Sequence, residues 1–391
     1  MKRKKLTIRL QTGEPIIIEL SAVCTLQSVF EKGFLQDVRH ILWEILPGRG
    51  RRSGLRQPNS GKIYRKVGRA ACGNDFSNTL YPGSVTAIAL DFQNNRNFRR
   101  YLMIPITGHT QLTALLGSPV AHSISPLMHN EAFHLLDLDY TYLCFNVNEE
   151  NLETAVMGLK TCGIRGFNLT MPNKNKIVEL LDELSPAARL IGAVNTVVND
   201  NGRLTGYNTD GVGYMQAVRD AGYDVIGKTI IIMGAGGAAT AICAQAALDG
   251  VKKIHIFARE TSRFWNRTQK LVENINATLP CQAILHENKD KKELAQAISE
   301  SALLLNATSV GMAPDTEGSI IEDTSLYHPD LIVSDVIYNP RETRFLREAR
   351  EAGCRTFNGM YMLLYQGAEA FRLWTGKKMP VEEIKAKYFS E

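Results

Sequence analysis

An apolar run near the middle of the chain ends in a glycine turn and continues into a stretch of small residues. Residues 229–233 read Thr-Ile-Ile-Ile-Met, and the turn that follows contains Gly234, Ala235, Gly236, Gly237 and Ala238. In a strand–turn–helix context Gly234 makes the tight turn, Gly236 admits a pyrophosphate to the backbone, and Ala239 allows close helix packing. A turn that serves packing alone is the alternative. The pattern predicts a dinucleotide-binding unit within an α/β fold.

Short apolar segments alternate with helical patterns on both sides of this turn, which predicts two domains. We expect an α/β substrate domain over 106–210, completed by 360–391, and a doubly wound dinucleotide-binding domain over 211–355. The predicted strands cover residues 112–116, 140–145, 166–169, 253–257, 303–306 and 331–336. Residues 360–375 are predicted to form a long helix that returns to the first domain, with Phe371 and Trp374 in the core.

Two hydroxyl side chains lie close together on a predicted loop in front of an amphipathic helix. Ser123 and Ser125 are two residues apart, and Pro126 suits the first turn of the helix that follows. Such hydroxyls can bind a polyol or a carboxylate. In the alternative reading Ser125 only caps the helix and His122 only packs.

A lysine, an asparagine and an aspartate each lie where a predicted strand ends or begins. A helix starting near Asn173 would put Lys174 in its first turn, where the helix dipole lowers the proton affinity of the amine. Asn195 begins an apolar strand, and Asp210 precedes a helix predicted over 212–221. Alone, Lys174 reads as a surface lysine and Asp210 as a helix cap. Together they predict a ligand site at the rim of an open sheet.

From about residue 106 to the C-terminus, these motifs and three more resemble the shikimate dehydrogenase family, in the group that includes the quinate/shikimate dehydrogenases. The three further motifs are residues 306–312 (Asn-Ala-Thr-Ser-Val-Gly-Met), 334–340 (Ser-Asp-Val-Ile-Tyr-Asn-Pro) and 358–368 (Asn-Gly-Met-Tyr-Met-Leu-Leu-Tyr-Gln-Gly-Ala). The resemblance implies a two-domain α/β protein whose second domain is a Rossmann fold. It also implies a role in aromatic amino acid (chorismate) biosynthesis.

The resemblance further assigns roles to individual residues. The substrate shikimate or 3-dehydroshikimate is expected to contact Ser123, Ser125, Thr170, Asn195, Asp210, Tyr338 and Gln366. The proton-transfer residue is expected to be Lys174, acting with Asp210. The coenzyme is expected to contact Gly234, Ala235, Gly236, Gly237, Ala238, Arg259, Glu260, Val336 and Gly359.

These residues fit the reversible reduction of a 3-keto group, with quinate as a second substrate to test. An ammonium at Lys174, oriented by Asp210, can stabilise a developing alkoxide and then give up its proton, while a nicotinamide supplies the hydride. Two other functions stay open. One is a metabolite-sensing regulator of the same fold without turnover, and the other is a dehydrogenase of another small cyclic hydroxy acid.

The residues after the second strand of the predicted Rossmann domain bear on the choice between NAD and NADP. Members of the family that favour NADP typically have Asn, Arg and Thr here, whereas this chain has Ala258, Arg259 and Glu260. Glu260 repels a 2′-phosphate and can accept from a free 2′-hydroxyl, whereas Arg259 and Arg263 act in the opposite direction. We expect NAD use or dual use.

Composition limits the remaining possibilities. The chain has 391 residues, enough for two domains and a further segment, and its seven cysteines are scattered, which favours a reducing cytoplasm over a disulfide framework. No histidine cluster has metal-ligand spacing, so no metal is expected. No apolar run is long enough to span a membrane, and no nucleic-acid partner is expected for the enzyme core. A homodimer is one candidate assembly.

The first hundred residues are the main puzzle. Residues 1–102 carry 18 Lys and Arg against 7 Asp and Glu, a net charge of +11, whereas the rest of the chain carries 27 against 33, a net charge of −6. A hairpin is predicted over 6–20, a weak helix over 26–46 and disorder over 48–69. We expect natural translation to start at Met103. The alternative is a basic extension that binds nucleic acid or an acidic surface.

Overall fold

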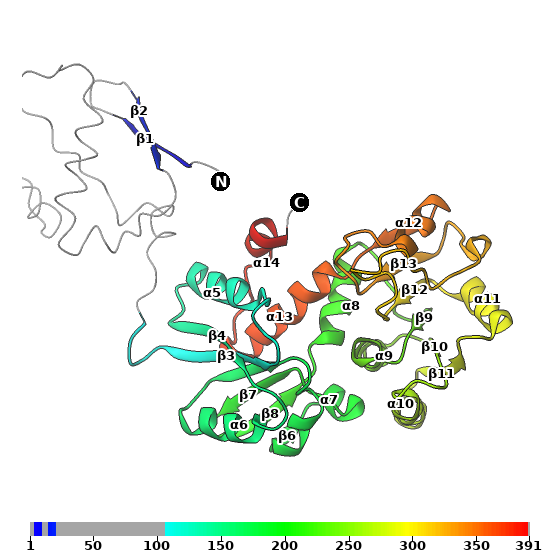
Figure 1. The fold of residues 1–391 in the computed structure, drawn as a ribbon, viewed down its shortest axis with the longest axis horizontal. Coiled ribbons are helices and arrows are strands. Elements are labelled where there is room, and N and C mark those ends of the chain that lie inside the picture. The colour runs from blue at the N-terminus through cyan, green and yellow to red at the C-terminus, as the bar shows by residue number, and fades with distance from the viewer. Residues whose placement is uncertain (1–3, 10–14, 21–105, 390–391) are drawn as a thin grey trace, which may run out of the picture. The chain divides into compact units, whose positions relative to one another are not determined.

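The computed structural model describes residues 4–9, 15–20 and 106–389, and the chain divides into two units, 1–105 and 106–391. In the first unit β1 (Lys4–Arg9) pairs antiparallel with β2 (Pro15–Leu20), which confirms the predicted hairpin. The predictions for 26–46 and 48–69 lie outside the described residues. The second unit contains two six-stranded sheets with helices around them (Figure 1).

The first sheet has the strand order β4-β3-β5-β7-β8-β6. Its strands are β3 (Gln111–Gly117), β4 (Tyr140–Asn146), β5 (Gly166–Leu169), β6 (Glu183–Leu184), β7 (Thr196–Asp200) and β8 (Arg203–Tyr207). The helices of this part are α5 (Ser125–Leu135), α6 (Leu152–Thr161) and α7 (Pro186–Ile191). The strands predicted over 112–116, 140–145 and 166–169 are confirmed. β3 and β5 are almost entirely buried, as is typical of central strands covered on both faces, whereas most residues of the edge strand β4 are partly buried or exposed.

One strand of this sheet is reversed, and the reversal positions the polar residues. β3, β4 and β5 are parallel, but β7 runs antiparallel to both β5 and β8. The beginning of β7 therefore lies at the edge where β5 and β8 end, with Asn168 opposite Thr196 and Thr196 opposite Tyr207. The sequence analysis expected Lys174, Asn195 and Asp210 at one rim of an open sheet, with Asn195 at the start of a strand. Asn195 reaches this shared edge because that strand is reversed.

The second sheet is fully parallel, in the order β11-β10-β9-β12-β13-β14. Its strands are β9 (Thr229–Met233), β10 (Lys253–Ala258), β11 (Gln282–Glu287), β12 (Leu303–Asn306), β13 (Ile332–Asp335) and β14 (Arg355–Phe357). Its helices are α8 (Asp210–Asp220), α9 (Gly237–Asp249), α10 (Trp265–Thr278), α11 (Lys291–Glu300) and α12 (Arg344–Glu351).

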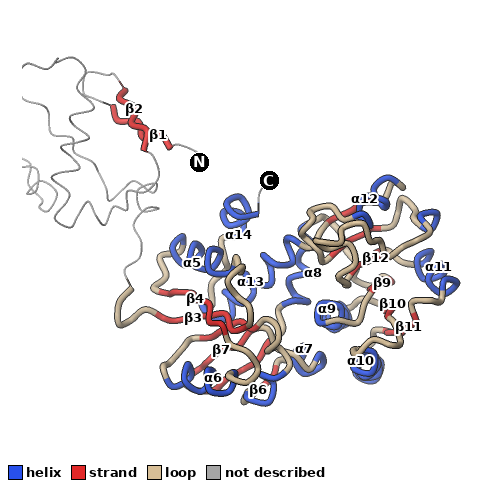
Figure 2. The backbone as a smooth tube through the Cα atoms, in the orientation of Figure 1, coloured by secondary structure: helices blue, strands red, loops and turns tan. Residues whose placement is uncertain are grey.

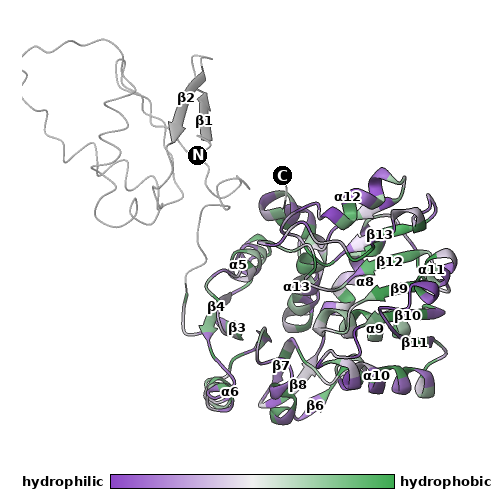
Figure 3. Cartoon of the chain, turned by 45° about the vertical axis from the view of Figure 1, so that its right-hand side comes forward, coloured by the Kyte–Doolittle hydropathy of each residue, from purple (hydrophilic) through white to green (hydrophobic). Residues whose placement is uncertain are grey.

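Counted along the chain, the strands of the second sheet lie in the order 3-2-1-4-5-6, which is the doubly wound arrangement of dinucleotide-binding domains. The order reverses between β9 and β12, and the glycine turn follows β9 at this switch point. Figure 3 shows hydrophobic strands at the centre of this part and mixed hydropathy on helices such as α10. The helix predicted after the glycine turn is confirmed as α9.

The long helix α13 (Met360–Thr375) packs along α8 between the two sheets (Figure 1 and Figure 2). The two backbones approach closely, since a Cβ at Gly213 would lie 2.6 Å from the backbone nitrogen of Gln366. At its far end Trp374 is buried in the core of the first sheet and donates to the carbonyl of Val197 at 2.9 Å. The core positions predicted for Phe371 and Trp374 are confirmed. The described residues end with α14 (Val381–Ile384) and a π-helical turn over Lys385–Phe389.

Candidate active site

Lys174 and Asp210 form an ion pair at the edge of the first sheet. The Lys174 Nζ lies 2.6 Å from Asp210 Oδ2. The side chains are 31% and 14% exposed, so both are partly shielded and neither is sealed from a ligand. The Lys174 carbonyl accepts from the backbone N–H of Val194 at 2.8 Å, which anchors the lysine's turn to the sheet. The structure thus brings together the amine and the carboxylate that the sequence analysis singled out.

The helix predicted to start near Asn173 is wrong. Residues 171–175 form turns, and only a 3-10 helix of five residues follows, from Lys176 to Leu180. The buried Asn173 side chain donates to the carbonyl of Val147 at 2.8 Å, which holds the chain in the turn instead. Lys174 therefore precedes the short helix, and the predicted action of a helix dipole on its amine loses its structural basis.

Asn195 binds the second oxygen of the Asp210 carboxylate. Its Nδ2 donates to Asp210 Oδ1 at 2.8 Å, while Oδ2 of the same carboxylate contacts Lys174. The Asn195 amide is itself fixed, because it is buried and its Oδ1 accepts from the backbone N–H of Thr209 at 2.8 Å. Each carboxylate oxygen of Asp210 therefore has a defined partner. Asp210 is the first residue of α8, so the carboxylate is also attached to a rigid helix.

A buried polar network continues from Asn195 to the serine loop. The Asn168 Nδ2 donates to Thr196 Oγ1 at 2.9 Å and to the Asn195 carbonyl at 3.1 Å. Asn168 Oδ1 accepts from the Tyr142 hydroxyl at 2.8 Å, and that hydroxyl is also hydrogen-bonded to Ser125. Burial raises the pKa of Tyr142 well above its usual range, so the hydroxyl stays protonated as a donor.

The sequence analysis did not identify Asn168 or Tyr142. Asn168 is a polar residue in the otherwise apolar segment 166–169, and a buried amide needs hydrogen-bond partners, so a signal was present. The reading of Ser125 as a helix cap does not hold. The residue at the cap position is Ile124, and Ser125 is the first residue of α5.

The other four predicted substrate residues are arranged less tightly. Ser123 lies in the loop before α5, where its hydroxyl accepts from the Ser125 N–H at 3.2 Å. Thr170 directly follows β5, with its side chain against Gly117. Gln366 lies on α13 and donates from its side chain to the Leu363 carbonyl of the same helix at 3.0 Å. Tyr338 follows β13 and is 49% exposed. Within the described part of the chain, neither Gln366 nor Tyr338 is hydrogen-bonded to the Lys174–Asp210 pair.

The glycine turn has the geometry that a bound pyrophosphate needs. Gly234 adopts a φ of +119°, and a Cβ there would lie 2.8 Å from the Ala307 carbonyl oxygen, so only glycine fits. Gly236 caps α9 without a side-chain hydrogen bond. A Cβ at Gly236 or Gly237 would meet no atom within 4 Å, so the space before the helix N-terminus is open. These residues fit a dinucleotide.

The loops after β13 and β14 are joined by close contacts. A side chain at Gly359 would collide with the backbone of Val336, so the two predicted coenzyme residues touch backbone to backbone. Next to them Asp335 is fully buried and accepts from the Ile337 N–H at 2.9 Å and the Thr343 hydroxyl at 2.8 Å. Burial raises the pKa of Asp335 to about 6. The sequence analysis missed this role of Asp335.

The turn after β10 contains Arg259 and Glu260, both exposed. The backbone N–H of Glu260 donates to the carboxylate of Glu287, at the end of β11, with an N···Oε2 distance of 2.5 Å. Glu287 was not among the predicted residues. Its position at the end of the next strand, paired in register with Ala258, brings it to this turn.

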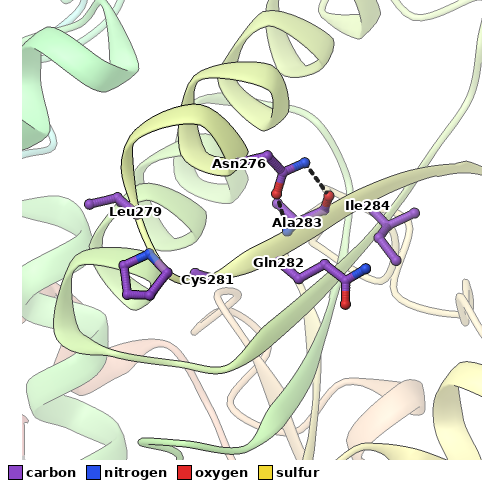
Figure 4. Close-up of a pocket in the computed structure, with 7 residues that line it drawn as sticks. Asn276, Leu279, Cys281, Gln282, Ala283 and Ile284 are labelled. Atoms are coloured by element: carbon purple, nitrogen blue, oxygen red, sulfur yellow. Dashed lines mark hydrogen bonds between the residues drawn. The ribbon is translucent and has the colours of Figure 1, made fainter.

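Other features of the described residues lie outside this site. A pocket of about 470 Å³ lies where α10 leads into the edge strand β11. The Asn276 side chain is hydrogen-bonded to the backbone N–H and carbonyl of Ala283, at 2.8 and 2.9 Å (Figure 4). The described residues contain no group of three His, Cys, Asp or Glu side chains that could hold a metal ion. Among the described helices, none is long and apolar enough to cross a membrane.

Comparison with known proteins identifies the family. The family model of the shikimate dehydrogenase substrate binding domain matches residues 115–197, and that of the shikimate 5'-dehydrogenase C-terminal domain matches residues 359–387. The chain is 53% identical over 280 residues to a shikimate dehydrogenase (NADP(+)) of Listeria monocytogenes serotype 4b, covering 72% of this chain and 96% of that protein. It is 43% identical over 280 residues to a quinate/shikimate dehydrogenase of Escherichia coli O139:H28, covering 72% and 97%.

A solved structure agrees with these matches. The crystal structure of a shikimate 5-dehydrogenase from Listeria monocytogenes, in complex with shikimate and NAD, superimposes with a TM-score of 0.71 at 52% identity. The match covers 73% of this chain and 98% of that one. The resemblance stated from the sequence motifs is therefore confirmed, and the chain belongs to the shikimate dehydrogenase family.

Proposed function

We propose that this protein is a shikimate dehydrogenase, which catalyses the reversible, nicotinamide-dependent reduction of 3-dehydroshikimate to shikimate. The observation that carries the proposal is the Lys174–Asp210 ion pair, held by Asn195 at the edge of the first sheet. Lys174 and Asn195 lie within the segment matched by the family model of the shikimate dehydrogenase substrate binding domain, residues 115–197. Oxidation of quinate is a further activity of the same site to be tested, since one relative is a quinate/shikimate dehydrogenase.

Lys174 acts as the proton-transfer residue. In the reductive direction its ammonium stabilises the negative charge that develops on the 3-oxygen of the substrate and then donates a proton to that oxygen. In the oxidative direction the neutral amine accepts the proton. Asp210 orients the amine through the 2.6 Å contact, and Asn195 prevents the carboxylate from turning away.

The substrate's carboxylate and hydroxyl groups are held by polar side chains around this pair. The proposed contacts are Ser123, Ser125, Thr170, Asn195, Asp210, Tyr338 and Gln366. The buried network through Asn168 and Tyr142 fixes Ser125 and Asn195 relative to each other, so two of these contacts are preorganised. Gln366 must exchange its bond to the Leu363 carbonyl for one to the substrate.

A nicotinamide dinucleotide, when bound, would supply the hydride. The residues that would hold it are Gly234, Ala235, Gly236, Gly237, Ala238, Arg259, Glu260, Val336 and Gly359. The open space before α9 supports this assignment, because backbone N–H groups at a helix N-terminus bind phosphate. Glu260 in the turn after β10 supports use of NAD, alone or alongside NADP.

We assign the substrate domain to 106–210 with 360–391 and the coenzyme domain to 211–355. α13 carries Gln366 along α8, between the two sheets, so closure of the domains would exclude water from the reacting atoms. We also place the protein in the cytoplasm, with a homodimer as the assembly to test by light scattering. The intact Lys174–Asp210 pair argues against a sensor without turnover, because a sensor needs no proton relay.

The test is a spectrophotometric assay of the full chain that follows nicotinamide absorbance. Shikimate and quinate are each offered with NAD and with NADP, in all four combinations. Turnover of shikimate with at least one coenzyme supports the proposal. Saturable binding of shikimate without any turnover would favour the sensor, and turnover confined to a different cyclic hydroxy acid would replace the substrate.

A further inference from the structure

The turn after β10 is held by a carboxylate from the neighbouring strand. β10 and β11 are parallel and in register to their last residues, so Ala258 lies opposite Glu287. The ladder extends one step further, because the Asn288 N–H donates to the Ala258 carbonyl at 2.9 Å. Glu287 is therefore positioned beside the first residues of the turn, and its carboxylate accepts from the Glu260 N–H at 2.5 Å.

Backbone hydrogen bonds within the turn hold it tightly, so the Glu260 N–H cannot easily turn toward another acceptor. The Ser262 N–H donates to the Arg259 carbonyl at 2.9 Å, and the Trp265 N–H donates to the Ser262 carbonyl at 2.9 Å. Backbone N–H groups in such turns are the usual donors to a bound phosphate. Here the N–H of Glu260 is already occupied by a carboxylate of the same chain.

Two negative and two positive side chains surround the turn, so removing one carboxylate changes the local net charge from zero to +1. Glu260 and Glu287 contribute two negative charges, and Arg259 and Arg263 contribute two positive charges. The Arg263 guanidinium lies over the Phe264 ring, 4.7 Å from its centroid, and is partly engaged there. A 2′-phosphate arriving at this turn would meet Glu287 both as a like charge and as a competitor for the Glu260 N–H. A 2′-hydroxyl would meet neither obstacle, because it can donate to a carboxylate.

We propose that Glu287 is a specificity-determining residue that selects against NADP at this turn. The inference rests on the proposed function, because it assumes that the turn after β10 receives the adenosine ribose. The Glu260 carboxylate is already expected to repel a 2′-phosphate. Glu287 adds a second carboxylate, from a different strand, which also occupies the Glu260 backbone N–H.

The test is calorimetric titration of the full chain with NAD and, separately, NADP, in the absence of substrate. The variants are Glu287→Gln, which keeps a side-chain acceptor for the Glu260 N–H but removes the charge, and Glu287→Ala, which removes both. Glu351→Gln is the matched control, since this exposed carboxylate ends α12, which packs on β13 and β14 at the other end of the sheet. Circular dichroism of each variant checks that it is folded.

We expect Glu287→Gln to tighten NADP binding roughly five- to tenfold, the size of the repulsion between two like charges about 4 Å apart in a water-like dielectric, with NAD binding changed less than about twofold. Glu287→Ala should tighten NADP binding at least as much. The gain should shrink as salt is raised, because salt screens charges at the surface. If Glu287 only supports the turn, its substitution should weaken the binding of NAD and NADP together, and the change should not depend on salt concentration.

Two results would overturn the inference, and they are distinguishable from failure of the proposed function. If wild type binds both coenzymes, and the ratio of NADP to NAD affinity in Glu287→Gln and Glu287→Ala equals that of wild type and of Glu351→Gln, Glu287 does not select between the coenzymes. If the Glu287 variants lose affinity for both coenzymes equally, the residue only supports the turn. If wild type binds neither coenzyme, the proposed function itself fails and the inference fails with it.

Discussion

The buried carboxylate of Asp335 should make the stability of this protein depend on pH in a defined direction. Its pKa is about 6 in the folded protein, compared with an ordinary value of 3.8, because burial disfavours the charged form. A carboxyl whose folded pKa is raised holds its proton longer in the folded state than in the unfolded state. Stability from this group is therefore lost as pH rises from the unfolded pKa through the folded pKa. At about 1.4 kcal/mol per pH unit, the loss amounts to about 3 kcal/mol.

Asp335→Asn removes this titration while keeping the size of the side chain. The amide NH₂ would face two donors, the Thr343 hydroxyl and the Asn306 Nδ2, so a constant cost of roughly 1–3 kcal/mol is expected. Urea unfolding followed by circular dichroism, repeated from about pH 4 to pH 7, gives the free energy of unfolding of both proteins. The advantage of wild type over the variant should fall by about 2 kcal/mol between pH 4 and pH 7, because the unfolded carboxyl is already more than half ionised at pH 4. A difference that is constant, or that grows with pH, would refute the reasoning.

Three further substitutions test other parts of the site. Asp210→Asn should lower kcat/KM by at least tenfold in steady-state kinetics, because the amide cannot form the ion pair with Lys174; unchanged kinetics would contradict this. Tyr142→Phe leaves Asn168 Oδ1 without its donor, so we expect about 1–3 kcal/mol lower stability in urea and a higher KM for shikimate, and a change in neither would count against the network. Gly359→Ala should lower the melting temperature by several degrees, because the methyl group collides with the Val336 backbone; a wild-type melting curve would show that the loops can separate without cost.

Local patterns were sufficient to predict the elements that determine the fold. The apolar run before Gly234 and the small residues after it indicated β9 and α9, because a tight turn with φ near +119° allows little besides glycine. The burial of Trp374 followed from the usual preference of aromatic side chains for the core. The pairing of Lys174 with Asp210 was also anticipated, since both were expected at one sheet edge.

The features that the sequence did not reveal depend on long-range contacts. The reversal of β7 is set by its pairing with β5 and β8, not by its own residues. The helix predicted at Asn173 is replaced by a turn because the Asn173 side chain bonds to the distant Val147 carbonyl. Glu287 contacts the turn after β10 only because two parallel strands end in register. No pattern local to these residues encodes such partners.

The most direct test of the account is the turnover of Lys174→Ala beside that of Lys176→Ala. Lys176 is two residues away, exposed, and paired with Glu179 at 2.8 Å on the surface, so its substitution removes an equal charge without touching the proposed relay. The account predicts that Lys174→Ala lowers kcat for shikimate oxidation by at least about a hundredfold with little change in shikimate affinity, and that Lys176→Ala behaves like wild type. Near wild-type turnover in Lys174→Ala, or an equal loss in both variants, would contradict it.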